Sequence, residues 1–188
     1  MLNKDMTRKE IEQFLQGKGD FVKIDYLNRL LKQDLALDKK KFVYAKLAEI
    51  YEKKGMLSSA AKICNSLAIF SIAFSEKSKH HVKEAELYIK VGAFESANEA
   101  VKKASKEATE MEKQNIYQTI KGFYKRQAEA HEKNMRRAQA VRIYEKLLEM
   151  NISELEREEI KQKLMALYEK LGRLKEYFSI KKKFDSKG

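Results

Sequence analysis

The chain has 188 residues, a formal net charge of +12 and 43% hydrophobic residues, so it is too apolar for a disordered chain and long enough to bury a core. It contains no proline, no tryptophan and only 7 glycines, which argues strongly against turn-rich all-β folds. Abundant Ala, Leu, Glu and Lys favour helices, so we expect an all-α protein.

Glycines separate helical hydrophobic patterns along the chain. Gly19, Gly55, Gly92 and Gly172 each lie between two such patterns, at spacings of 36, 37 and 80 residues. The last spacing is about two periods, and Met135 lies where the intervening turn is expected. Glycine suits these turns because it accepts the left-handed conformation that ends a helix. The predicted helix pairs span about residues 7–37, 41–74, 78–110, 115–152 and 155–184 of a single domain, residues 1–188.

Two predicted helix starts carry a capping box, in which each of two side chains accepts a hydrogen bond from a free backbone N–H. These are Thr7 with Glu10 and Ser153 with Glu156. Residues 106–118 contain no glycine or proline, so we expect the extra residues there to lengthen the helices rather than form a loop.

The helix pair at residues 41–74 has the clearest pattern. The stripe on its first helix consists of Tyr44, Leu47, Ala48 and Tyr51, and the stripe on its second helix of Ala60, Cys64 and Leu67. With a glycine turn between them, these stripes resemble the tetratricopeptide repeat, and the resemblance extends over about residues 7–184. It implies a right-handed superhelical solenoid of five antiparallel helix pairs, with the first and last pairs as caps.

No residues with the spacing of a catalytic or metal site are found in the sequence. His80 and His81 are adjacent and diverge by about 100° on a helix, so they cannot chelate one ion. The only other histidine is His131, and no phosphate-cradling glycine loop is present. Cys64 falls on a core stripe, where a buried, inert thiol is expected. We therefore expect no enzyme, no metal and no cofactor.

The resemblance implies that the first helix of each pair lines a concave groove that binds a protein or peptide partner. The groove positions are Lys9, Phe42, Glu49, Glu52, Val82, Glu86, Ile89, Lys125 and Glu129. This set is predominantly acidic, with apolar positions at Phe42, Val82 and Ile89. The predicted function is a non-enzymatic interaction scaffold or adaptor.

A second interpretation starts from the positive charge, which favours acidic partners. The cationic residues form a basic edge on second helices and at the C-terminus: Arg136, Arg137, Arg142, Lys146, Arg173, Lys175, Lys181, Lys182 and Lys183. This alternative is a ribosome- or RNA-associated factor that contacts phosphates through this edge.

The apolar run at residues 67–74 leaves the oligomeric state open. We expect a neighbouring repeat to bury it in a monomer, and the alternative is a homodimer through Ile69, Phe70 and Phe74. The run is far shorter than the roughly 20 residues that span a bilayer, so no membrane insertion is expected. A polar start and a single cysteine, which permits no internal disulfide, favour a cytoplasmic location.

Overall fold

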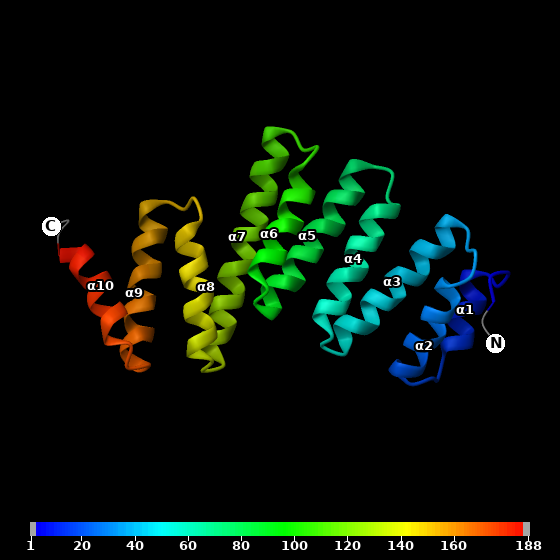
Figure 1. Ribbon diagram of the computed structural model, residues 1–188, viewed down its shortest axis with the longest axis horizontal. Helices are drawn as coiled ribbons and strands as arrows, with labels where there is room; N and C mark the ends of the chain where they lie inside the picture. Colours follow the sequence, from blue (N-terminus) through cyan, green and yellow to red (C-terminus); the bar gives the residue numbers. More distant parts are fainter. Residues whose placement is uncertain (1–2, 186–188) are drawn as a thin grey trace. The chain divides into compact units, whose positions relative to one another are not determined.

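The computed structural model describes residues 3–185, with side chains described as far as Lys182, and this part of the chain contains ten α-helices and no strand (Figure 1). The all-α prediction is confirmed. In chain order the helices are α1 (Arg8–Leu15), α2 (Asp20–Leu31), α3 (Leu37–Lys53), α4 (Leu57–Phe70), α5 (Phe74–Val91), α6 (Phe94–Ser105), α7 (Glu110–Lys133), α8 (Arg137–Glu149), α9 (Glu154–Lys170) and α10 (Leu174–Asp185).

The chain divides into two compact units, and the division falls within α7, between Ile116 and Tyr117. Unit 1 contains α1 to α6 and the start of α7, and unit 2 contains the rest of α7 and α8 to α10. Each unit is described by itself below.

Four short turns, each joining the two helices of a pair, share one hydrogen-bond pattern. In each, an N–H donates to the carbonyl oxygen five residues earlier: Met56 to Tyr51, Ala93 to Tyr88, Arg136 to His131 and Arg173 to Tyr168, over 2.8–2.9 Å. This is the six-to-one bond of a Schellman motif, which places one residue in the left-handed conformation. Those residues are Gly55, Gly92, Met135 and Gly172, with φ of 71°, 76°, 57° and 68°, as the sequence predicts.

The first pair departs from this pattern. Gly19 has a φ of −66° because it is the N-cap residue of α2, and an N-cap residue takes an extended conformation. The left-handed residue is Gly17, with a φ of 74°. The prediction of a left-handed turn at Gly19 was therefore wrong by two residues.

Capping boxes begin three helices. Those at Thr7 and Ser153 are confirmed, each with an N3 glutamate bonded back to the N-cap backbone. A third box, which the sequence analysis missed, joins Thr109 to Glu112: the Thr109 N–H donates to Glu112 Oε2 over 2.8 Å. It follows a break at residues 106–109, which precedes the predicted boundary between the helix pairs at about residues 110–115. The added length lies in α7, which has 24 residues.

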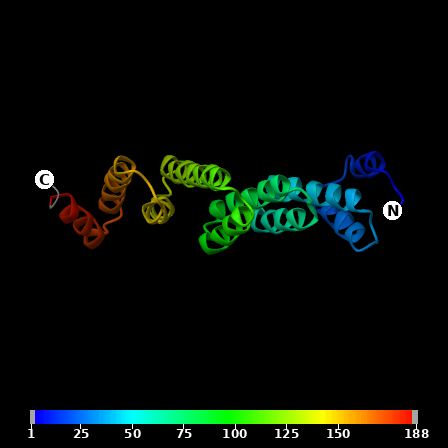
Figure 2. The ribbon, with the colours of Figure 1, turned by 90° about the horizontal axis from the view of Figure 1, so that it is seen from above.

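In unit 1, successive helices pack on each other from α2 to α6 (Figures 1 and 2). The core around α1, α2 and α3 includes Ile11, Leu27 and Leu47, all fully buried. Between α4 and α5 the core consists of the small side chains of Ala60, Ala61 and Cys64, packed with Leu87. Small residues permit this close approach because larger ones would force the helices apart.

One carboxylate is buried in unit 1. Glu84 Oε2 lies 2.9 Å from His81 Nδ1, and Glu84 Oε1 lies 3.5 Å from Lys103 Nζ. Lys103 also donates to Asn65 Oδ1 over 2.9 Å. A buried charge is tolerated when it is paired in this way, and the contacts join α4, α5 and α6.

In unit 2, α8 packs on α9 and α9 packs on α10. The hydroxyls of two buried tyrosines donate hydrogen bonds to carboxylates: Tyr144 to Glu132 over 2.6 Å and Tyr168 to Glu145 over 2.7 Å. Burial and these carboxylates raise the pKa of both phenols above the ordinary value, so the hydroxyls remain donors.

Ion pairs align the first helices of successive pairs in parallel. In unit 1, lysines of α3 and α5 meet glutamates of the preceding first helix: Lys46 and Glu12 at 2.9 Å, Lys83 and Glu52 at 2.9 Å. In unit 2, Lys163 of α9 lies 3.9 Å from Glu129 of α7. A reversed pair, Lys121 with Glu156 at 3.0 Å, has nearly the same residue offset. Neighbouring first helices are thus parallel, displaced by 31 to 35 residues.

The left-handed turn residues predict opposite effects for two substitutions. Gly92→Ala should lower the free energy of unfolding by about 1 kcal/mol, because a residue with a Cβ is strained at this φ. The strain lies in the backbone itself, since no atom lies within 4 Å of the added Cβ. Met135→Gly should stabilise slightly, since it removes the same strain. Urea denaturation followed by circular dichroism measures the free energy of unfolding of both variants. A change in the same direction for the two would contradict this account of the turns.

The carboxylate of Glu156 predicts an acid-sensitive contribution to stability. Hydrogen bonds from Lys125, the Ser153 backbone and Lys121 lower its pKa to about 2. A pKa lower in the folded chain than in the unfolded chain stabilises above the unfolded value, and this contribution is lost as the pH falls through the folded value. Glu156→Gln should therefore be destabilising at about pH 7, with the difference from the natural chain shrinking in acid. An unchanged difference at about pH 3 would show that the ion pairs contribute nothing.

Candidate protein-binding groove

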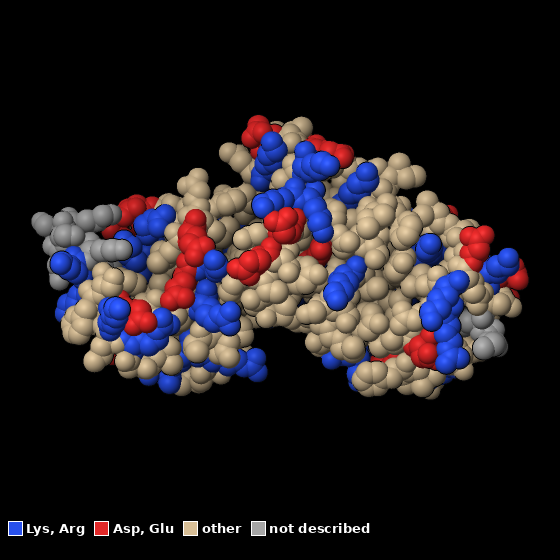
Figure 3. All heavy atoms as spheres, in the orientation of Figure 1, with Lys and Arg blue, Asp and Glu red and all other residues tan. Residues whose placement is uncertain are grey.

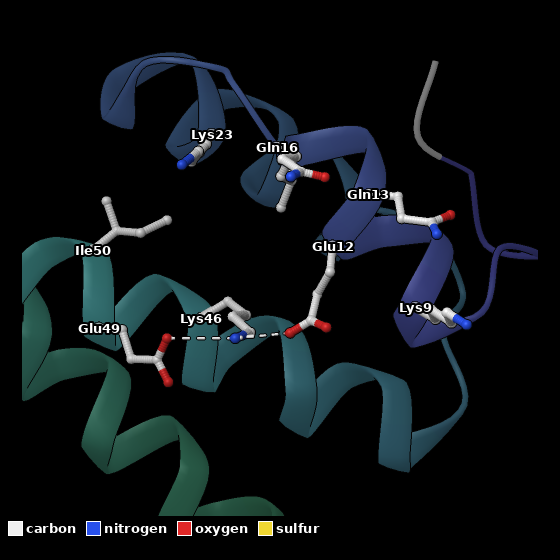
Figure 4. Close-up of a pocket in the computed structure, with 9 residues that line it drawn as sticks. Lys9, Glu12, Gln13, Gln16, Lys23, Lys46, Glu49 and Ile50 are labelled. Atoms are coloured by element: carbon white, nitrogen blue, oxygen red, sulfur yellow. Dashed lines mark ion pairs between the residues drawn. The ribbon is translucent and has the colours of Figure 1, made fainter.

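A pocket of about 430 Å³ opens in unit 1 between α1, α2 and α3 (Figure 4). Its base is apolar, formed by Leu15 and Ile50, and its rim is polar. The rim residues are Lys9, Glu12, Gln13, Gln16, Lys23, Lys46 and Glu49. Two of the predicted groove residues, Lys9 and Glu49, are thus brought together in this pocket.

Lys46 lies at the centre of the charges in this pocket. Its ammonium is 2.9 Å from Glu12 Oε1 and 3.6 Å from Glu49 Oε2 (Figure 4). The hydrogen bond with Glu12 raises the pKa of Lys46, against the effect of burial. Glu12 and Glu49 thus share one lysine partner within the pocket, which compensates half of their charge. Among the described residues, no carboxylate lies within ion-pair distance of Lys9 or Lys23, so these two ammonium groups are available to an anionic ligand.

Phe42 extends the pocket region along α3. Its half-buried ring lies between two cations, with Arg8 Cζ 5.9 Å and Lys46 Nζ 5.7 Å from the ring centroid. Such contacts orient the ring because the cations are attracted to its faces. The predicted apolar position at Phe42 is thus partly accessible beside the pocket.

Further along unit 1, the groove positions form a network of ion pairs. Glu52 is paired with Lys83, and Lys83 also lies 3.1 Å from Glu86. Lys90 lies 2.6 Å from the other oxygen of Glu86. Burial pushes the pKa of Glu86 up, but hydrogen bonds from Lys90 and Lys83 outweigh it and hold the pKa below its ordinary value.

These pairs correct the expectation of an acidic groove. The carboxylates of Glu49, Glu52 and Glu86 each have a lysine partner, so the surface in unit 1 is a mixture of compensated charges. Each lysine lies either about one repeat period from its glutamate in the sequence or about one helical turn from it on the same helix. Opposite charges at a spacing of 31 to 35 residues were the signal that could have revealed them.

The apolar groove positions on α5 are less accessible than expected. Val82 is half-buried, and Ile89 is only 1% exposed. Ile89 belongs to the buried face of α5, on which α4 and α6 both pack. Its assignment as a partner-binding residue was therefore wrong.

Lys125 and Glu129, the remaining groove positions, lie on α7 in unit 2. Lys125 Nζ is 2.5 Å from Glu156 Oε1, and Glu129 is paired with Lys163. Both side chains therefore join α7 to α9. The pairing leaves little free charge at these two positions.

The predicted basic edge is dispersed over unit 2. Arg136 and Arg137 lie at the turn between α7 and α8, and Arg173 and Lys175 at the turn between α9 and α10. The other cations stand further along their helices: Arg142 and Lys146 on α8, and Lys181 and Lys182 on α10. Lys146 is paired with Glu149 at 2.9 Å. The Lys183 side chain lies outside the described residues.

The apolar run at residues 67–74 is only partly buried. Leu67 and Ala68 are in the core, as expected, but Ile69 is 69% and Ile72 is 82% exposed. Phe70 stacks on Tyr44 with a centroid distance of 5.6 Å, and Phe74 is half-buried at the start of α5. The expectation that a neighbouring repeat buries the run was thus wrong for Ile69, near the end of α4, and for Ile72, in the connection from α4 to α5.

No group of three or more His, Cys, Asp or Glu side chains in the described residues is arranged to hold a metal ion. Within the same residues, no helix combines the length and apolar character needed to cross a membrane. Cys64 is buried beside Ala60, Ala61 and Leu87.

The comparisons with known proteins identify no relative. No protein-family model, no curated protein and no solved structure matches this chain.

Cys64 offers a direct test of burial in the α4–α5 core. Burial raises the pKa of its thiol to about 12, so almost no thiolate is present at neutral pH. Alkylation by iodoacetamide at about pH 8 should be at least 100-fold slower in the native chain than in urea. Mass spectrometry measures the rate without ambiguity because this is the only cysteine. Equal native and denatured rates would place the thiol at the surface.

Proposed function

We propose that this protein is a tetratricopeptide-like α-solenoid that acts as a non-enzymatic scaffold and binds a segment of a partner protein in the pocket between α1, α2 and α3. The solenoid assignment is supported by two repeated features. Four turns share the same six-to-one hydrogen bond. Within each unit, neighbouring first helices are parallel at a nearly constant offset. Repeats of this kind stack because one helix pair cannot bury its apolar face alone.

The pocket is the observation that carries the proposed activity. Its volume of about 430 Å³ can accommodate side chains of a peptide, and it combines an apolar base with polar groups that can fix orientation. Its groups without internal ion pairs are cationic or neutral: Lys9, Lys23, Gln13 and Gln16. A peptide segment with an apolar side chain next to a carboxylate would complement this surface.

Site-specific photo-crosslinking in source cells tests this function. A photoreactive phenylalanine analogue at Gln16, on the pocket rim, should yield an adduct with one or a few discrete polypeptides. The same analogue at Ser58, an exposed residue of α4 outside the pocket, is the matched control and should yield no such adduct. Lys9→Glu with Lys23→Glu should abolish the Gln16 adduct, because it reverses the charge presented to the carboxylate.

Treatment with nuclease and washing at high salt separate the scaffold from the RNA-associated alternative. A protein adduct at Gln16 that survives both treatments supports the proposal. If Gln16 and Ser58 give the same adducts, the pocket is not the binding site. If the recovered material is ribosomal RNA that nuclease or salt releases, the basic residues of unit 2 form the functional surface instead.

A further inference from the structure

The two turns of unit 2 lie at one edge of that unit. Because α7 and α9 are parallel, with Lys121 beside Glu156 and Glu129 beside Lys163, their C-terminal ends point the same way. The α7–α8 turn therefore lies next to the α9–α10 turn (Figure 1). We call residues 133–137 and 170–175 the turn edge.

The turn edge is cationic and largely without internal counter-ions. Its charged residues are Lys133, Arg136, Arg137, Lys170, Arg173 and Lys175, and it contains no acidic residue. Arg173 is paired with Glu176 at 2.6 Å. For the other five cations, no carboxylate within the described part of the chain lies at ion-pair distance. Figure 3 shows lysine and arginine side chains gathered on the lower margin of the region formed by α7 to α10.

Neighbouring carboxylates compensate part of this charge, since Glu145 lies 3.7 Å from Arg173 in addition to Glu176. Glu132 accepts a hydrogen bond from the Tyr144 hydroxyl, and its Oε2 lies 4.0 Å from Lys163 Nζ. Glu169 is exposed beside the edge. In addition, the first turn of α8 has no acidic residue and no side-chain cap, so the partial positive charge of its N–H groups adds to that of Arg136 and Arg137.

The apolar residues at the turn edge decide between two kinds of anionic partner. Met135 is 66%, Leu174 is 58% and Leu171 is 36% exposed, and they are interleaved with the cations. A nucleic acid would use the cations, but its bases stack on aromatic side chains, and the turn edge contains none. An anionic membrane uses both features, because apolar side chains enter the headgroup region while lysine and arginine contact the lipid phosphates.

We propose that the turn edge docks reversibly on a membrane surface that contains anionic phospholipid. The contact is limited to the headgroup layer, since it consists of two turns. This activity goes beyond the proposed scaffold function and uses a different unit of the chain. It would hold the scaffold at a membrane while the pocket in unit 1 binds its partner segment.

Co-sedimentation of the full chain with vesicles tests the docking. The protein should sediment with phosphatidylcholine vesicles that contain phosphatidylserine, and not with phosphatidylcholine alone. Arg136→Glu with Arg137→Glu should lower the partition constant by at least about 30-fold at low ionic strength, since each basic residue at such a surface contributes about 1 kcal/mol and the new carboxylates are repelled by the lipid. Equal sedimentation with both kinds of vesicle, or an unchanged partition constant, would overturn the proposal.

A matched control separates the turn edge from the net charge of the protein. Lys62→Glu with Lys106→Glu makes the same change in charge at exposed positions of unit 1. It should lower the partition constant by less than about threefold, because these residues would lie outside the contact. A loss equal to that of the Arg136 and Arg137 variant would show that binding depends on overall charge alone.

A second pair of substitutions tests the apolar part of the contact. Met135→Gln with Leu174→Gln leaves the charge unchanged and should lower the partition constant about tenfold, because less apolar surface leaves water. Circular dichroism checks that each variant is folded. Fluorescence anisotropy with single-stranded RNA provides the competing result. RNA binding that requires Arg136 and Arg137, without loss of vesicle binding in the glutamine variant, would assign the turn edge to RNA.

Discussion

The parallel alignment of successive first helices is the constraint on which the arrangement of each unit depends. Lysine–glutamate pairs such as Glu12 with Lys46 and Glu129 with Lys163 are matched in this alignment. Partly exposed pairs of this kind contribute little free energy each. A shift of one first helix along its neighbour by one helical turn would separate all the ion pairs between them. Together the pairs therefore disfavour other alignments. The register in turn brings corresponding turns to the same edge and corresponding rim residues to the same pocket.

The local features of the fold could be predicted well from the sequence. The turn at Met135 was located from the repeat period although methionine is not a turn residue, because the backbone hydrogen bonds of the turn depend on spacing more than on side chains. The break at residues 106–109 lies a few residues before the predicted boundary, because no glycine or proline marks it. Thr109 and Glu112 carry the same capping signal as Thr7 and Glu10, so the information was present in the sequence.

The candidate site was harder to predict, because surface properties depend on which neighbour covers a residue. Ile89 has the spacing of a groove residue, yet α4 and α6 cover the helix that carries it. Glu52 and Glu86 contribute acidity in a composition count, but Lys83 and Lys90 together supply each of them with an ion-pair partner. Ile72 has the composition of a core residue and lies in a connection with no helix over it. For Ile89 and Glu52 the outcome depends on neighbouring helices, which the pattern of a single helix does not show.

The packing of helices on their neighbours in sequence also affects how the chain folds. Most contacts within each unit join segments that are close in the sequence, which lowers the entropy lost on closing loops and favours rapid folding. The absence of proline removes prolyl isomerisation, the usual cause of a slow phase in refolding. During synthesis, folding can therefore begin once neighbouring helix pairs have left the ribosome and can cover each other, and later pairs then add to an existing surface.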